Sequence, residues 1–584
     1  MINSRQKRII SIISSAILIA VFCTACGEKQ ADKPIDPSPT QSAIDTISTQ
    51  QAIVPEVQQT SQQAIEPITE EYKRSEEIIT EQAATPAVIM QAEPQMKIPE
   101  SDEKIYLGKN EKGLYLVNKV DGYAFVVPDD SKLDISRMEA ETIFQNDNIE
   151  ASVFTQKLKT DASKNNYIKY SLNFLKDNPT EHILISDDTA TVNKSLSIRT
   201  VKWTRPLLSK IEDDKNCYTA MFLKTPDAIY HLLIRSKPGF DDTDICQTVK
   251  TSFQTIEQTE SANTFLYTPL CNSDNFSSMH DASTTEFYNK VFIQSDKPTW
   301  GIFHSTDTND EPLSSLEAKI DYHFDIYLDY RGISNSFNFD SYTNKVKSIQ
   351  NEGRTYELTL QPPNYANGTS PVYAILDGKN DSYLSELADF LKSLHHPVLL
   401  RICNEMNGDW CNYCAYHYSD DAHLYRAMYS YIMQYLKDQD VKNVIWVWNP
   451  NEKSFPSYKW NNAVLYYPNE GSDVYGITGY NTGTYYSGGE TWRSFEEIYD
   501  PIYKDAERRA KIPMMITEFS CSEIGGDKAA WIEDMFNKLP SYPKIKAAVW
   551  WNSCDFDNTQ DPPCISREYR LTEDCLTIFK NHLN

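Results

Sequence analysis

Residues 399–410 read Leu-Leu-Arg-Ile-Cys-Asn-Glu-Met-Asn-Gly-Asp-Trp, and they give the clearest single indication of the fold. The apolar run over 397–400 is short and β-compatible, which predicts a buried strand rather than a helix. Polar side chains then gather around one carboxyl, Glu405. A buried parallel strand that ends in such a cluster is typical of a (β/α)8 barrel, which presents its functional residues at the C-terminal ends of its strands. A polar turn after a core strand is the alternative interpretation of Asn404-Glu405 taken alone.

The sequence around this stretch alternates apolar strands with amphipathic helices. The expected strands are 300–304, 324–328, 356–360, 398–402, 444–448, 474–478, 514–517 and 547–551, and helical spacing lies between them, for example at 384–394, 422–437 and 528–539. This pattern predicts an α/β fold, a (β/α)8 TIM barrel over residues 262–584. A doubly wound open sheet is the rival fold, but no Gly-rich phosphate loop follows the first strand.

The ends of the expected strands carry the candidate chemistry. Strand four ends at Glu405 and strand seven at Glu518, so two carboxyls project into one barrel mouth together with Tyr480, Trp410 and Trp551. Two carboxyls facing a cleft are the minimum equipment for glycoside hydrolysis, one protonated as the acid and one ionised. Aromatic faces suit the apolar faces of sugar rings. A strand-end glutamate in a salt bridge is the plainer alternative for each carboxyl.

Five blocks in order resemble family 26 glycoside hydrolases. They are 377–384 (Asp-Gly-Lys-Asn-Asp-Ser-Tyr-Leu), 400–410 with Glu-Met-Asn-Gly-Asp-Trp, 444–451 (Val-Ile-Trp-Val-Trp-Asn-Pro-Asn), 476–481 (Gly-Ile-Thr-Gly-Tyr-Asn) and 516–519 (Ile-Thr-Glu-Phe). The resemblance covers roughly 300 residues, the C-terminal half of the chain. It implies a (β/α)8 retaining glycosidase that needs no cofactor and no metal.

The resemblance also implies roles for single residues. Glu405 is expected as acid/base and Glu518 as nucleophile, with Tyr480 bonded to the nucleophile. Trp410 and Trp551 are expected to line the sugar subsites. Of the neighbouring pair Trp550 and Trp551, either could be the one that faces the sugar while the other packs in the core. Arg401 stands among the substrate-binding candidates, although its place behind the acid favours ion pairing within the site.

One position departs from the family pattern. Asn404 stands where the family usually has His, and an Asn there hydrogen-bonds the sugar 2-hydroxyl in the wider clan. His304, at the end of strand one, is another candidate for sugar contact, with a structural role as its alternative. The expected function is an endo-β-1,4-mannanase acting on plant mannan, with β-1,3-1,4-glucanase (lichenase) or xylanase as alternatives. A non-catalytic carbohydrate-binding lipoprotein is the alternative of another class.

The first hundred residues predict export and attachment. Residues 1–26 combine basic residues, an apolar run over 9–22 and small residues before Cys26, which resembles a lipoprotein-type signal with Cys26 as the lipidation site, although Cys23 stands where such signals usually have Leu. Simple secretion and an uncleaved anchor are the alternatives. Residues 27–103 are rich in Pro, Gln, Thr, Ser and Glu and predict a disordered linker. We therefore expect an extracellular, lipid-anchored bacterial protein on the cell membrane.

Composition narrows the partners. The net charge is −26, with 82 acidic against 56 basic residues, so a phosphate backbone is repelled and no nucleic acid partner is expected. The expected partners are a polysaccharide substrate and the membrane, and the chain is expected to be a monomer. Residues 104–258 contain strand-like runs and two helical stretches, which predict a small α+β accessory domain of open role.

The chain has 12 cysteines, and export permits disulfides. Three local pairs are expected, Cys217 with Cys246, Cys411 with Cys414 and Cys554 with Cys564. A structural zinc is the rival for Cys411 and Cys414. A calcium site is the rival of a disulfide-closed acidic loop for the acidic residues Asp555, Asp557 and Asp561.

Overall fold

The computed structural model describes residues 97–259, 279–365, 368–488 and 490–584. The expected signal segment 1–26 with Cys26, and nearly all of the expected linker 27–103, lie outside these ranges. Among the helices in the described ranges, none has the length and apolar character needed to cross a bilayer.

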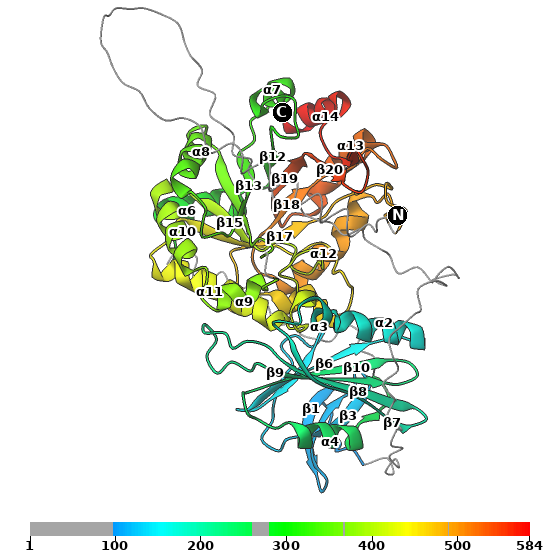
Figure 1. The fold of residues 1–584 in the computed structure, drawn as a ribbon. Helices are drawn as coiled ribbons and strands as arrows, with labels where there is room; N and C mark the ends of the chain where they lie inside the picture. Colours follow the sequence, from blue (N-terminus) through cyan, green and yellow to red (C-terminus); the bar gives the residue numbers. More distant parts are fainter. Residues whose placement is uncertain (1–96, 260–278, 366–367, 489) are drawn as a thin grey trace, which may run out of the picture. The chain divides into compact units, whose positions relative to one another are not determined.

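The C-terminal part is a closed barrel of eight parallel strands in chain order, which confirms the predicted fold class (Figure 1). The strands are β12 Thr299–His304, β13 Ile326–Gly332, β14 Thr355–Gln361, β15 Val398–Ile402, β16 Val444–Trp448, β17 Val474–Thr478, β18 Met514–Phe519 and β19 Ile545–Asn552. Strand β19 pairs with β12 in parallel and closes the barrel. The C-terminal ends of all eight strands therefore meet at one mouth.

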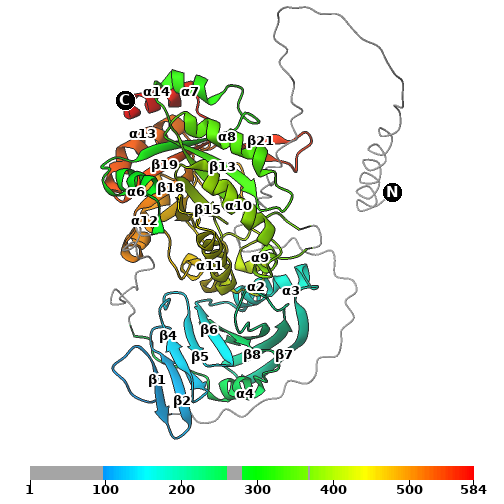
Figure 2. The ribbon, with the colours of Figure 1, turned by 90° about the vertical axis from the view of Figure 1, so that its left-hand side faces the viewer.

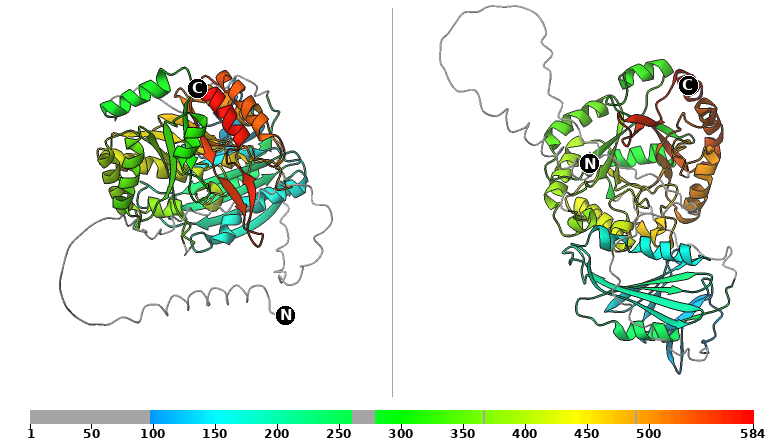
Figure 3. Two further views of the ribbon diagram at one scale, coloured as in Figure 1. Left: turned by 90° about the horizontal axis from the view of Figure 1, so that it is seen from above. Right: turned by 45° about the vertical axis from the view of Figure 1, so that its right-hand side comes forward.

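Helices surround this barrel, as Figures 2 and 3 show. They are α6 Ala282–Tyr288, α7 Leu313–Ile320, α8 Phe339–Asn351, α9 Pro371–Leu376, α10 Asp381–Leu394, α11 Ala422–Asp438, α12 Phe495–Arg509, α13 Lys528–Lys538 and α14 Glu573–Leu583. Short helical turns are η1 Asn289–Ile293, η2 Ala415–His417, η3 Lys459–Asn461, η4 Ala463–Tyr466 and η5 Leu539–Ser541. In α10 the buried Leu384, Leu387, Leu391 and Leu394 recur at helical spacing, so one face packs against the barrel.

The barrel interior is apolar at its closed end. A cluster of inward side chains fills it, including Leu328, Leu399, Ile445, Met515 and Val549. Two charged residues interrupt this filling, Glu357 of β14 and Arg401 of β15, and neither side chain is exposed. Burying charges in a core costs desolvation free energy, so a buried ion pair here calls for an explanation. Arg401 also contacts Glu518 at the barrel mouth, which links this pair to the site described below.

Residues 97–259 form an α+β domain. One sheet has the order β1-β2-β3-β11 and the other β4-β5-β6-β10-β9-β8-β7, and both are antiparallel throughout. The elements are β1 Ile105–Asn110, β2 Gly113–Asn118, β3 Tyr123–Val127, β4 Lys132–Asp134, β5 Thr142–Gln145, β6 Ile149–Gln156, α2 Asp161–Ser171, α3 Asn173–Asp177, β7 Ile183–Asn193, β8 Leu196–Thr204, β9 Cys217–Lys224, β10 Ile229–Ser236, α4 Thr243–Ser252 and β11 Gln254–Thr255. The expected strands and helices of this segment fall on these elements.

Side chains of this α+β domain bond directly to barrel residues. Trp203 Nε1 donates to Ser419 Oγ at 3.0 Å, and Trp460 Nε1 donates to Ser171 Oγ at 3.0 Å. All four side chains are buried, and one hydrophobic cluster contains residues of both parts. Because they share buried contacts, the experiments below use the whole chain.

The three expected disulfides are wrong. Cys217, Cys246, Cys411, Cys414, Cys554 and Cys564 are all free thiols. In the hairpin of β20 Cys554–Asp557 and β21 Cys564–Glu568, Cys554 lies opposite Glu568 and Cys564 opposite Asp557, so the two thiols stand at different ends. Cys411 Sγ faces the Asn404 carbonyl, whereas Cys414 Sγ faces Asn461 Oδ1. Proximity in sequence therefore did not bring these sulfur atoms together.

Candidate active site

The end of strand β15 turns sharply to present Glu405. Cys403 and Glu405 both adopt left-handed backbone conformations, with φ of 49° and 55°. The Glu405 N–H donates to the Asn449 carbonyl of the next strand end at 2.7 Å. Such conformations cost free energy for residues that have a Cβ, so the surrounding contacts must maintain them.

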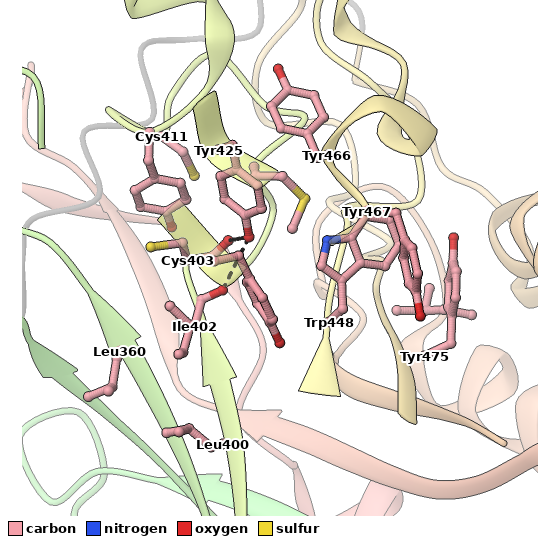
Figure 4. Packing of buried hydrophobic residues seen from close by; sticks show 14 of the residues in the cluster. Leu360, Leu400, Ile402, Cys403, Cys411, Tyr425, Trp448, Tyr466, Tyr467 and Tyr475 are labelled. Atoms are coloured by element: carbon pink, nitrogen blue, oxygen red, sulfur yellow. Dashed lines mark hydrogen bonds between the residues drawn. The ribbon is translucent and has the colours of Figure 1, made fainter. Parts of the chain in front are cut away.

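Neighbouring phenols hold this turn in place. Tyr425 of α11 donates to the carbonyls of Ile402 and Cys403 at 3.3 and 2.9 Å, and Figure 4 shows its hydroxyl directed at this strand end. Tyr413 donates to the Asn404 carbonyl at 2.8 Å. The backbone carbonyls beyond the end of the strand thus accept hydrogen bonds from side chains, because no neighbouring strand is there to donate to them.

Glu405 has the environment of a proton donor. Removal from water raises the pKa of Glu405 to about 8, and the negative charge of Glu518 adds to the rise. Asn451 Nδ2 donates to Glu405 Oε1 at 2.5 Å, which opposes the rise without reversing it. At neutral pH Glu405 therefore carries its proton.

Glu518, on β18, has the opposite environment. Its Oε2 accepts a hydrogen bond from Tyr330 at 2.5 Å and lies 2.6 Å from Arg401 Nη1, while its Oε1 accepts from Tyr480 at 3.0 Å. Three donors, one of them a buried cation, engage both oxygens of this carboxyl and fix its orientation. The two carboxyls of the site thus have different surroundings.

Asn404 is buried and oriented by the neighbouring strand. Gln361, the last residue of β14, donates from Nε2 to Asn404 Oδ1 at 2.8 Å. The amide oxygen of Asn404 is thereby engaged within the protein. The arrangement holds the residue that replaces the family's usual His in one orientation beside the acid.

Two tryptophans lie at the mouth, and a third lies in the core. Trp551 is partly exposed, stacks on Phe303 with ring centroids 5.4 Å apart, and meets Tyr480 edge-on at 6.1 Å. Trp410 is also partly exposed, and its ring packs so close to Gly408 that a Cβ there would lie 2.4 Å from it. Trp550 is fully buried, so of these two neighbours Trp551 is the one that exposes part of its ring.

Arg401 and His304 are engaged within the protein. Arg401 is fully buried, and besides Glu518 it donates from Nε to Thr359 Oγ1 and from Nη1 to Asn449 Oδ1. It therefore acts by ion pairing rather than by reaching a sugar. His304 is buried, and its ring nitrogens lie 2.8 Å from the Glu311 carbonyl oxygen and 3.0 Å from Asn552 Nδ2. These contacts favour the structural alternative stated for His304.

Three residues of the site were missed from the sequence. Tyr330 lies beyond the expected end of strand two, because β13 extends to Gly332 through polar residues that lack an apolar signal. Gln361 ends strand three one residue beyond the expected range. Asn451 stood inside a quoted family block without a role. Asn451 and Gln361 could have been recognised from the sequence, because each follows the end of an expected strand.

Two of the acidic residues after strand eight, Asp555 and Asp557, are engaged by protein partners. Asp555 Oδ2 pairs with Arg567 Nη1 at 3.0 Å, and Asp557 accepts from Thr559 and from Tyr485. Within the described ranges, no group of three or more His, Cys, Asp or Glu side chains is arranged to hold a metal ion.

A barrel that presents one carboxyl on strand four and another on strand seven has the pair of acidic groups that glycoside hydrolysis requires. A model of glycosyl hydrolase family 26 matches residues 370–538, which include both carboxyls. This match lies within the C-terminal half of the chain, where the five sequence blocks resemble the same family.

Several known proteins are similar to this chain. Endoglucanase H of Acetivibrio thermocellus is 32% identical over 213 residues, which are 35% of this chain and 22% of that protein. The chain therefore spans about a fifth of the length of this curated relative. The β-mannanase BoMan26A of Bacteroides ovatus aligns with 15% identity over 52% of this chain and 93% of its own, with a TM-score of 0.39. A Cellulomonas fimi endo-β-1,4-mannanase double mutant aligns with 14% identity over 54% and 76%, with a TM-score of 0.41.

Proposed function

We propose that the barrel is a retaining endo-β-glycanase. The observation that carries this proposal is the contrast between its two carboxyls. Glu405 holds a proton because its pKa is raised to about 8, whereas Glu518 is oriented by three donors, one of them the Arg401 guanidinium. Retaining glycosidases require this division of labour between a general acid and a nucleophile.

The proposed reaction has two steps. In the first, Glu518 attacks the anomeric carbon while Glu405 protonates the departing sugar oxygen, and a covalent glycosyl-enzyme forms. In the second, Glu405, now ionised, takes a proton from water, which attacks the same carbon and releases Glu518. Tyr330, Tyr480 and Arg401 orient the nucleophile, and Trp551 offers an aromatic face to the sugar.

Two polymers are candidate substrates. The family resemblance favours β-mannan, which is the first candidate. β-Glucan is the second, because the relative that shares 32% identity over 213 residues is named an endoglucanase. Asn404, oriented by Gln361, stands beside the acid where a sugar 2-hydroxyl is expected. Mannose and glucose differ in the orientation of that hydroxyl, so this residue is where the two sugars are expected to be distinguished.

The test is reducing-sugar release by the whole chain from mannan, mixed-linkage β-glucan and xylan. The wild type is compared with Glu518→Ala and Glu405→Ala, and with Glu533→Ala as a control on the outer helix α13, where Glu533 contacts His582. We expect hydrolysis of one polymer, lost in both site variants and retained in the control. Binding of a polymer without hydrolysis by the wild type would support the non-catalytic binding protein instead.

The attachment of the chain is a separate proposal. The basic, apolar and small-residue pattern that ends at Cys26 supports lipidation and anchoring at the outer face of a bacterial cell membrane. Expression in a bacterium fed a labelled fatty acid tests this. We expect label in the wild type and none in Cys26→Ala, while equal labelling of both would refute the assignment.

A further inference from the structure

Glu357 is an ionisable residue that the proposed reaction does not use. It lies on β14 inside the barrel, opposite Leu328 of β13 and Leu399 of β15 in the strand register. The residue is 0% exposed, and neither carboxyl oxygen has a hydrogen-bond partner. A buried carboxyl without hydrogen bonds is costly in its charged form, so its presence here requires a reason.

Among the residues that the structure describes, the cation near Glu357 is Arg401. The distance from Arg401 Nε to Glu357 Oε1 is 3.6 Å, an ion-pair contact rather than a hydrogen bond. On its other side, Arg401 Nη1 lies 2.6 Å from Glu518 Oε2. One buried guanidinium therefore stands between two carboxyls, one of them the proposed nucleophile.

The charge on Arg401 needs a counter-ion in each state of the reaction. In the free enzyme Glu518 is ionised and serves as that counter-ion. In the glycosyl-enzyme Glu518 is an ester, so its charge is gone and Arg401 is left buried beside Glu357. Removing the partner of a buried charge is strongly unfavourable.

We propose that Glu357 is the reserve counter-ion of Arg401, protonated while Glu518 is ionised and ionised while Glu518 carries the sugar. This inference rests on the proposed retaining function. When the bond between Glu518 and the anomeric carbon forms, the Glu357 carboxyl releases its proton to bulk water. The proton returns when the ester is hydrolysed, so Glu357 is a positioning residue that acts through Arg401.

The electrostatics of the free enzyme agree with this geometry. Burial raises the pKa of Glu357 to about 8, Arg401 lowers it, and the Glu518 charge raises it. Arg401 on β15 and Glu518 on β18 are the charged groups that act on Glu357, and its register neighbours Leu328 and Leu399 are apolar. When Glu518 is esterified, its negative charge no longer raises the pKa of Glu357, whereas the positive charge of Arg401 still lowers it. The pKa of Glu357 therefore falls on glycosylation.

The test measures protons released when Glu518 is trapped. The 2,4-dinitrophenyl 2-deoxy-2-fluoro-β-glycosides of cellobiose and mannobiose form a stable ester with a retaining nucleophile, and dinitrophenolate leaves as an anion without taking a proton. Because Glu405 also responds to the Glu518 charge, all measurements use the whole chain with Glu405→Gln. Release is followed with a pH indicator in weakly buffered solution at pH 7, and mass spectrometry counts the ester.

We expect about one proton per ester for the Glu405→Gln parent and none after Glu357→Gln is added. Glu357→Met, which removes the carboxyl but keeps an apolar side chain, serves if the Gln variant does not fold. Glu141→Gln, at a buried glutamate paired with His423, is the matched control and should release as much as the parent.

The outcomes separate the two proposals. Absence of ester on Glu518 with either glycoside overturns the retaining function and with it the premise of this inference. Ester formation without proton release, or with equal release in the parent and both Glu357 variants, overturns the role of Glu357 and leaves the retaining function standing.

Discussion

Tyr330 of strand β13 donates a hydrogen bond to Glu518 of strand β18, with 2.5 Å between the phenol oxygen and Oε2. The two strands are not neighbours in the barrel, so the bond crosses its mouth. Together with the bond from Tyr480 it restrains both carboxylate oxygens of Glu518, the proposed nucleophile. The geometry of Glu518 thus depends on strands two, four and six rather than on its own strand alone.

Removing either phenol should therefore impair catalysis. We expect Tyr330→Phe to lower kcat by about 10²-fold with little change in KM, because a preorganised donor at the reacting carboxylate is lost. Tyr327→Phe is the control on the same strand, since its hydroxyl bonds the His304 carbonyl instead. Steady-state kinetics on the hydrolysed polymer measures both. An unchanged kcat in Tyr330→Phe would show that this bond does not support the reaction.

The pKa of Glu405 predicts the alkaline limb of activity. Glu405 is raised to about 8, so the protonated acid is lost as pH rises through that value. We expect kcat/KM on the polysaccharide to fall above about pH 8. A dinitrophenyl glycoside, whose leaving group needs no proton, should not show that fall in its glycosylation rate. A common limb for both substrates would assign it to a different group.

Glu357 predicts how stability depends on pH. Its folded pKa of about 8 lies above the ordinary 4.5, so between these values the folded chain retains a proton that the unfolded chain has released. The stability contributed by this group is therefore present at low pH and declines as pH rises from about 4.5 to 8. We expect the thermal midpoint of Glu357→Gln to fall less between pH 5 and pH 8 than that of the wild type. Parallel curves would contradict this.

The two adjacent tryptophans should behave differently. Trp550 is fully buried between Phe519 and Phe579, so Trp550→Ala should destabilise the chain by about 3–5 kcal/mol. Trp551 is partly exposed beside Tyr480, so Trp551→Ala should mainly raise KM. Thermal unfolding and polymer kinetics measured on both variants separate the two effects. A raised KM in Trp550→Ala together with lost stability in Trp551→Ala would contradict this assignment.

The six cysteines that were expected to form disulfides are free thiols, so a reductant should not change the stability of the chain. Alkylation of the denatured chain without reduction should label Cys217, Cys246, Cys411, Cys414, Cys554 and Cys564, as read by peptide mass spectrometry. Added dithiothreitol should leave the thermal midpoint unchanged. Detection of a Cys411–Cys414 linked peptide would contradict the structure at that loop.

Much of the barrel could be predicted because its signals are local. The expected strands 398–402, 444–448 and 474–478 agree with β15, β16 and β17, since each is a short apolar run between turn residues. The second strand was misplaced, because β13 continues through Asp329, Tyr330 and Arg331, which carry no apolar signal. Burial of polar residues is decided by partners from other strands, and a single strand does not encode them.

The eight-strand pattern and the positions of Glu405 and Glu518 at strand ends could be predicted from the chain alone, because apolar runs and motif spacing are properties of neighbouring residues. The resemblance implied that Glu405 is the acid, but the burial that raises its pKa, the bond from Tyr330 to Glu518 and the place of Glu357 beside Arg401 are visible only in the tertiary structure. These features arise when strands far apart in the chain bring charges and donors together in a space from which water is excluded. A pKa and a hydrogen bond depend on that surrounding and not on the residue alone.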